Sequence, residues 1–126
     1  MATNLKGAKF GALTAGTTTT GGDVLALANP EGVDLIVTLL ILDVTTPATG
    51  TPSVDAGIAA DATTSADNLI DGCAVGLAAG SYNSIVNAGE HGEGCVKWGA
   101  DEYLTVTPSA SAAGLVGNYY VQYIRV

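Results

Sequence analysis

The hydrophobic positions of this chain form short runs separated by polar segments rich in Gly, Pro and Thr. The longest run covers residues 33–44, and half of its residues are β-branched. It is shorter than the roughly 18 apolar residues that a membrane helix needs. Turn-forming residues flank it, at 29–32 and at 45–47. The pattern therefore predicts a long buried strand.

Both faces of this predicted strand are apolar. Counted with a period of two, one face holds Val33, Leu35, Val37, Leu39 and Ile41, and the other holds Ile36, Thr38, Leu40, Leu42 and Val44. A strand with one solvent-exposed face would alternate apolar and polar residues. We therefore expect one face in the domain core and the other against a second sheet or another subunit.

Further strands are predicted by shorter apolar runs between turn signals. They cover residues 23–28, 53–59, 85–86, 95–98, 103–107 and 116–126. One helical turn starting at Ser65 is the only helical signal, and there is no internal repeat. Short strands between Gly/Pro/Thr loops predict an all-β fold, a single jelly-roll or β-sandwich domain over residues 23–126.

Residues 1–22 precede the first confident strand and are predicted to be a flexible N-terminal arm. Five glycines and the run 17–20 of four threonines leave only isolated apolar residues, too few to order the segment alone. One interpretation is a passive tail. The other is a tether that binds a partner, with Phe10 and Leu13 as apolar anchors and Lys6 and Lys9 facing an acidic surface.

Charge narrows the classes of partner. Charged residues make up 13% of the chain, against about 25% in an average globular protein. The net charge is −8, and the first 22 residues hold two lysines and no acid. An acidic body argues against binding of nucleic acids or anionic membranes. Sparse surface charge is typical of a protein that partners cover.

The two cysteines, Cys73 and Cys95, are too few for a disulfide framework, and their spacing fits no zinc motif. We expect partly buried free thiols, with pairing as the alternative. The first residues contain no apolar segment of signal-peptide length, so we expect synthesis in a cytoplasm.

Two stretches contain residue types that can carry chemistry. His91, the only histidine, lies near Glu93 and Cys95, and Cys73 would be the fourth ligand of a zinc site. Four acids could gather around calcium, at Asp55, Asp61, Asp67 and Asp71, although their spacing fits no EF-hand. Solvated loops explain both stretches more simply. We therefore predict no catalytic residue, no metal and no cofactor.

Aromatic residues give one further candidate. Trp98, Tyr119, Tyr120 and Tyr123 would form a platform for stacking on sugar rings. Because aromatic residues favour strands, packing within a sheet is the simpler interpretation.

Three stretches, 29–34 with 43–50, 61–72 and 120–126, resemble small virion proteins of tailed double-stranded-DNA bacteriophages. Within that group the chain is most similar to capsid decoration, or cement, proteins. The resemblance implies a β-sandwich or β-barrel body, a trimer on the capsid exterior, and clamping of neighbouring major capsid protein subunits. It carries over no catalytic residues.

The leading hypothesis is therefore a non-enzymatic phage structural protein that decorates and stabilises the capsid exterior as an oligomer, most simply a trimer. Its partner would be the major capsid protein, its location the virion, and its site of assembly the host cytoplasm. The second hypothesis is a receptor- or glycan-binding module of a head or tail fibre. The third is an enzyme based on His91 and Cys95.

Overall fold

The computed structural model describes residues 5–126, and these form nine strands that make two antiparallel sheets. The all-β prediction and the β-sandwich architecture are confirmed. The strands are β1 (Lys6–Ala12), β2 (Leu25–Ala28), β3 (Leu35–Thr46), β4 (Val54–Ala59), β5 (Ile70–Cys73), β6 (Gly80–Asn83), β7 (Val96–Trp98), β8 (Tyr103–Pro108) and β9 (Val116–Arg125). Within residues 5–126 no helix is long and apolar enough to span a membrane.

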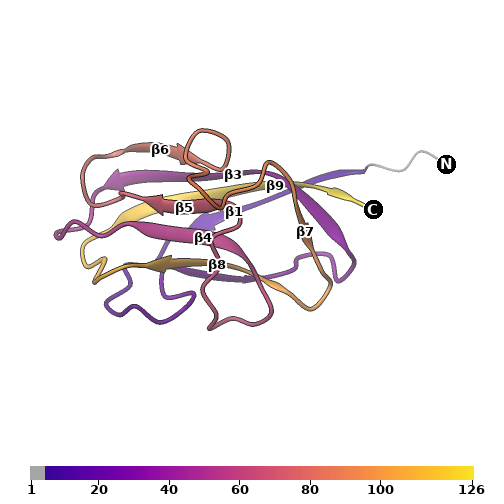
Figure 1. Ribbon diagram of the computed structural model, residues 1–126, viewed down its shortest axis with the longest axis horizontal. Helices are drawn as coiled ribbons and strands as arrows, with labels where there is room; N and C mark the ends of the chain where they lie inside the picture. The colour runs from indigo at the N-terminus through magenta and orange to yellow at the C-terminus, as the bar shows by residue number, and fades with distance from the viewer. Residues whose placement is uncertain (1–4) are drawn as a thin grey trace.

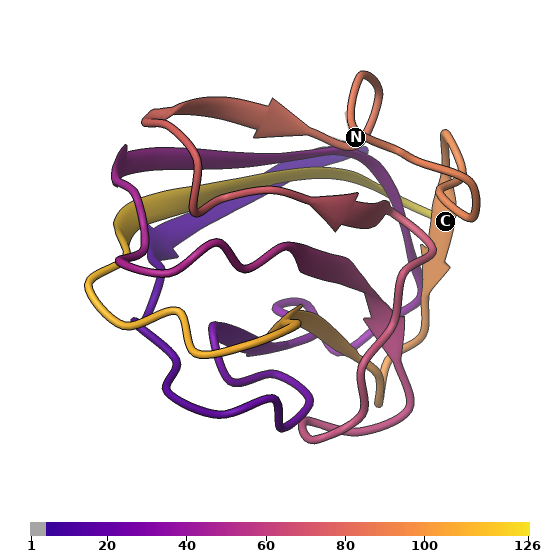
Figure 2. The ribbon, with the colours of Figure 1, turned by 60° about the vertical axis from the view of Figure 1, so that its left-hand side comes forward.

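The strands divide between two layers, which Figures 1 and 2 show from two sides. Sheet A has the order β1-β9-β3-β6, and β7 pairs with the first residues of β3, on the side where β6 pairs with its later residues. Sheet B has the order β2-β8-β4-β5. Successive strands β1 to β4 thus alternate between the two sheets.

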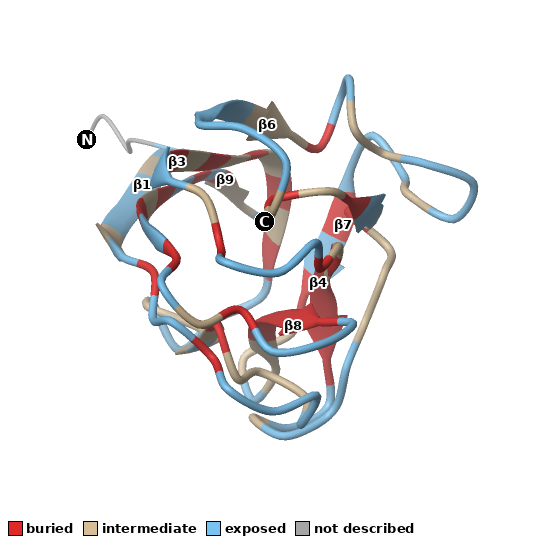
Figure 3. Cartoon of the chain, turned by 90° about the vertical axis from the view of Figure 1, so that its left-hand side faces the viewer, coloured by how far each residue is buried: buried red, intermediate tan, exposed pale blue. Residues whose placement is uncertain are grey.

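The core fills the space between the sheets, where buried residues of both layers meet (Figure 3). Sheet B contributes Leu104, Val106 and Ala56, all fully buried. Sheet A contributes the inward-facing side chains of β3 and β9, among them Leu40 and Val121, which are fully buried. Trp98 on β7 is also fully buried, and its indole N–H donates to the carbonyl of Glu102 at 3.0 Å. A large aromatic side chain with a satisfied polar atom is well suited to this position.

A β-bulge in β3 changes which residues of the long strand face the core. Val37 pairs with Tyr123, but the next pair is Leu39 with Gln122, so Thr38 is the extra residue. Leu40 is fully buried and Leu39 is only partly buried. The two faces predicted from strict alternation are therefore wrong beyond Val37. The core face continues through Leu40, Leu42 and Val44, because one inserted residue moves every later side chain to the other face.

The predicted flexible arm is also wrong for the described part of residues 1–22; residues 1–4 lie outside the described residues. Lys6–Ala12 is the strand β1, paired along its whole length with β9. The chain stays attached beyond it, since the Leu13 amide donates to Gly117 and the Thr14 amide donates to Val24. The segment is ordered because β9 pairs with β3 on one edge only, and β1 forms its hydrogen bonds along the other edge.

The remaining differences concern short elements. The strand predicted at residues 85–86 is instead a turn that exposes both side chains. The region around Ser65 forms no helical turn, and β5 and β6 appear where no strand was predicted. Both missed strands are four residues long and contain glycine, which weakens any periodic signal.

Candidate functional sites

The outer face of sheet A is apolar and uncovered. On β1, Ala8 and Phe10 face away from the core, opposite Gln122 and Tyr120 of β9. On β3, the partly buried Ile36, Leu39 and Ile41 continue the same face, as does Ile124 of β9, which pairs with Ile36. These side chains form a continuous surface across three neighbouring strands. We call it the outer patch; it comprises Ala8, Phe10, Ile36, Leu39, Ile41, Tyr120 and Ile124, together with Ile85 and Val86 described below.

Phe10 and Tyr120 form the aromatic part of the outer patch. Their rings stack with 6.2 Å between centroids and an angle of 22° between planes. Phe10 is 72% exposed and Tyr120 is 42% exposed. Burying an aromatic side chain of this size gives one of the largest hydrophobic gains available to an interface. An exposed pair on a flat sheet is therefore a candidate anchor for a partner.

A shallow groove lies at the other end of the outer patch, against β6. Its volume is about 300 Å³, and its lining residues are Leu39, Ile41, Ser81, Asn83, Ile85 and Val86. Ile85 and Val86 are held there by the side-chain oxygen of Asn83, which accepts both of their amide N–H groups. Val86 is 79% exposed. The turn after β6 thus presents two large apolar residues to solvent in a defined conformation.

The outer face of sheet B shows the opposite arrangement, because the chain covers it. Thr105 on β8 is completely buried, and its hydroxyl donates to the carbonyl of Thr64 at 2.9 Å. The Asn68 side chain bonds both the amide and the carbonyl of Ile58 on β4. Residues 61–69 therefore lie over sheet B, and the outer face of sheet A has no equivalent segment among the described residues.

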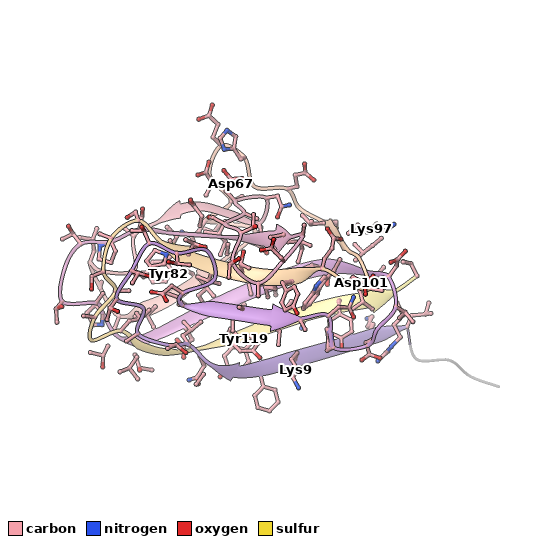
Figure 4. All side chains as sticks on the ribbon, turned by 90° about the horizontal axis from the view of Figure 1, so that it is seen from below. Lys9, Asp67, Tyr82, Lys97, Asp101 and Tyr119 are labelled. Carbon is pink, nitrogen blue, oxygen red and sulfur yellow. The ribbon has the colours of Figure 1, made fainter. Side chains whose placement is uncertain are left out.

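Charge is also divided between the sheets. All four basic residues lie on strands of sheet A, namely Lys6, Lys9, Lys97 and Arg125, and those strands hold one acid, Asp43. The other eleven acids lie elsewhere, so the sheet A strands carry a formal +3 and the remainder −11. Figure 4 shows Lys9 and Asp67 at opposite edges of the molecule. The strands of sheet A thus hold the basic residues of an acidic protein, but Lys97 and Arg125 form ion pairs with Asp34 and Glu31, which lie outside those strands.

The four residues predicted to bind a partner have different surroundings. Lys6 lies on the outer face opposite Ile124, and Phe10 belongs to the outer patch. Lys9 is exposed but alternates to the other face of β1, opposite Val121. Leu13 is buried in the core at 8% exposure, so its prediction as a partner anchor is wrong. It follows β1 directly, where the chain turns toward sheet B.

The predicted sugar platform does not exist as a surface. Trp98, Tyr119 and Tyr123 are all buried, and Trp98 contacts Tyr123 edge to face at 6.4 Å between ring centroids. Tyr120 alone of the four reaches solvent. Packing within the sheet, the simpler interpretation, accounts for the other three.

The chain was also compared with known proteins. No protein family, curated protein or solved structure matches it. Functional inference therefore rests on the geometry of the chain itself.

A second candidate site joins residues that sequence reasoning placed in two separate groups. His91 Nδ1 lies 2.9 Å from Asp67 Oδ2 and 3.1 Å from Asp71 Oδ2. Within the described residues this is the one group of three potential metal ligands, all within 4.8 Å of one another. The zinc set weighed as an alternative from the sequence is not assembled, since neither Cys95 nor Cys73 belongs to this group. The calcium set weighed there is divided, because Asp61 instead accepts bonds from Thr63 and Thr64.

Electrostatics at this cluster follow from its excess of carboxylates. The hydrogen bond of the His91 ring to the Asp67 carboxylate, the negative charge of Asp67 and that of Asp71 raise the pKa of His91. Asp55 lies nearby, and its pKa is raised mainly by burial and then by repulsion from Asp71 and Asp67. The cluster, which we call the histidine–carboxylate cluster (Asp67, Asp71, His91), can therefore bind a proton or a cation. All three residues were candidates from the sequence, but in two separate groups, because His91 lies 20 residues from Asp71 in the chain.

Proposed function

We propose that this chain is a non-enzymatic structural protein of a tailed-phage virion, which decorates and stabilises the capsid exterior. The outer patch would dock on the major capsid protein, and the protein would act as an oligomer, most simply a trimer. The observation that carries this proposal is the uncovered apolar outer face of sheet A. Exposed apolar patches of this kind mark sites of protein association.

The strand pairings support the proposal, because we infer from them a jelly-roll topology. With β7 set aside, the eight other strands form four nested antiparallel pairs: β1 with β9, β2 with β8, β3 with β6, and β4 with β5. Nested pairs are what a long hairpin produces when it is rolled into two sheets. Jelly rolls of eight strands occur in viral capsid and lectin domains. Since a fold alone does not fix a function, the outer patch remains the main argument.

The energetics of docking favour a partner that is apolar and edged with acid. Apolar burial contributes about 25 cal/mol per Å². A standard interface buries about 800 Å² on each partner, so docking would have to bury most of the outer patch. Lys6 lies on the same face of β1 as Phe10, so an acidic edge of the capsid surface would be attracted to it at low salt.

Binding to purified expanded heads of the encoding phage tests the proposal. We expect the wild-type protein to bind heads and raise their melting temperature. Phe10→Asp and Leu39→Asp should retain the wild-type fold and lose occupancy, because each places a charge in the outer patch. Ala28→Asp, at an exposed position of β2 on sheet B, is the matched control and should bind normally. Heads that bind no wild-type protein would refute the decoration function.

The glycan-binding alternative has lost its structural basis, because three of its four aromatic residues are buried. A glycan array still separates the two functions. Specific binding of one sugar class that is abolished by Tyr120→Ala would favour a receptor-binding module over a decoration protein.

A further inference from the structure

Three side chains of metal-ligating types converge at one point outside the outer patch. Asp67 lies in the segment 61–69 that covers sheet B, Asp71 lies on β5, and His91 lies in the loop before β7. Both carboxylate oxygens lie about 3 Å from the same imidazole nitrogen. The cluster thus offers one nitrogen and two oxygen ligand atoms, which distinguishes it from a group of acidic residues alone.

The backbone holds these side chains together independently of the imidazole ring. The Asp71 amide donates to the carbonyl of Ala88 at 3.1 Å, and the Glu93 amide donates to the carbonyl of Asn68 at 2.9 Å. The His91 amide donates to Asp71 Oδ2 at 3.2 Å. The two loops are therefore fixed to each other on both sides of the cluster. A site whose supports are in place loses little entropy when it binds an ion.

Two carboxylate oxygens approach the one ring nitrogen. Nδ1 carries at most one proton, which can form one good hydrogen bond, and Asp71 Oδ2 also accepts the His91 amide. Asp55 adds a third carboxylate to the surroundings. A divalent cation would interact with all three ligand atoms at once and neutralise both ligand carboxylates.

We propose that Asp67, Asp71 and His91 bind a divalent transition-metal ion of the Zn²⁺ class. Zinc bonds to histidine nitrogen and carboxylate oxygen are about 2.0–2.2 Å long, which at tetrahedral angles places ligand atoms roughly 3.3–3.6 Å apart. The distances of 2.9 and 3.1 Å from Nδ1 to the carboxylates are a few tenths of an ångström shorter, so a small movement of the exposed His91 ring would reach that spacing. An imidazole ligand favours zinc and its neighbours over calcium and magnesium, which prefer oxygen. The exposed His91 leaves room for water to complete the coordination.

The bound ion would clamp the loop before β7 to the segment that covers sheet B. A ligand that binds only the folded chain stabilises it by mass action. The site therefore adds a metal-dependent term to the stability of this edge of the sandwich, separate from the docking of the outer patch.

Titration calorimetry with ZnCl₂ on the full chain tests this site. The expected result is saturable binding of one ion per chain, with a rise in melting temperature as zinc is added. His91→Ala and Asp67→Asn should each abolish both effects. Glu90→Gln is the matched control, since Glu90 is an exposed acid beside His91 that is not a ligand, and it should bind as the wild type does. Cys95→Ser controls for the exposed thiol and should also retain binding.

Three results would overturn the proposal: no saturable zinc binding by the folded wild-type chain, binding unchanged in His91→Ala, or binding lost only in Cys95→Ser. The first would show that the cluster is an ion pair between loops and nothing more. Circular dichroism of each variant establishes that it is folded. Asp67→Asn, at a half-exposed side chain, provides the decisive variant if His91→Ala does not fold.

Discussion

Gly7 of β1 lies directly opposite Tyr123 of β9, and the tyrosine ring covers the glycine. A Cβ atom built on Gly7 would lie only 2.5 Å from Tyr123 Cε1. The pair Gly11 and Tyr119 repeats the arrangement four residues along, with a closest approach of 3.0 Å. Glycines on an edge strand that aromatic rings of the neighbouring strand cover are a known means of stabilising a sheet. This relationship attaches β1 to the sandwich.

The first prediction follows from that close approach. Gly7→Val should destabilise the fold by about 1–3 kcal/mol, because the Tyr123 ring is buried and cannot move aside freely. Ala8→Val is the matched control: Ala8 is exposed on the other face of β1, and its substitution should change stability little. Urea unfolding followed by circular dichroism measures both. Equal stability of the two variants would mean that the tyrosine does not constrain Gly7.

The second prediction concerns the bulge in β3. Val37→Asp and Leu40→Asp should each cost several kcal/mol and prevent folding, because both side chains are fully buried in the core. Leu39→Asp should fold, since Leu39 lies on the outer patch and can hydrate a charge. Solubility and thermal melting of the three variants test the register. A folded Leu40→Asp with an unfolded Leu39→Asp would contradict the bulge.

The main strands could be predicted from sequence because their apolar runs are long and clearly bounded. The bulge could not, because an inserted residue leaves no mark in a run that is apolar on both faces. It explains why residues 33–44 lack alternation: the inner face changes parity at Thr38, and the outer face is an exposed apolar patch. The strand therefore has a second apolar face, but its residues differ from those predicted and neither sheet of the described residues covers it; its contact with another subunit stays a prediction.

The strand β1 could not be predicted from the sequence for a different reason. β1 has few apolar residues because its inward positions include Gly7 and Gly11, whose covering rings come from the far end of the chain. Local composition therefore predicts disorder for a segment that orders only through β9. The repeated spacing, Gly7 to Gly11 and Tyr119 to Tyr123, is the one signal in the sequence that fits this pairing. The histidine–carboxylate cluster likewise depends on contacts between loops that no spacing reveals.

The third prediction concerns the two thiols. Both cysteines are free, but Cys73 is buried and Cys95 is exposed. Burial raises the pKa of Cys73 to about 11. Because the thiolate is the reactive form, Ellman's reagent at mildly alkaline pH should modify one thiol per native chain and two after denaturation. Cys95→Ser should show almost no reaction while native. Rapid modification of native Cys95→Ser would show that Cys73 is accessible.

The raised pKa of Cys73 also makes the stability of the fold depend on pH. The pKa of Cys73 in the folded chain lies above its ordinary value of 9.0, so the unfolded chain loses this proton first as pH rises. The contribution of Cys73 is therefore complete below pH 9.0 and is lost as pH rises toward about 11. Cys73→Ala should show a smaller loss of melting temperature over that interval than the wild type.

The last prediction concerns the contact that joins the turn before β3 to the end of β9. Glu31 accepts two bonds from the Arg125 guanidinium, each 3.0 Å long, and one from the Tyr123 hydroxyl at 2.8 Å. These partners lower the pKa of Glu31 below its ordinary value of 4.5, with the Arg125 hydrogen bond as the largest cause. The unfolded chain therefore takes up this proton first as pH falls. The stabilisation is present above pH 4.5 and is lost as pH falls through the lower folded value.

Glu31→Gln should lower the melting temperature at neutral pH, and the difference from wild type should shrink in acid. Asp101→Gln removes an exposed acid that makes no such contact, and it should leave a constant difference across the same range. A Glu31→Gln difference that stays constant with pH would show that the charge of Glu31 does not stabilise this contact.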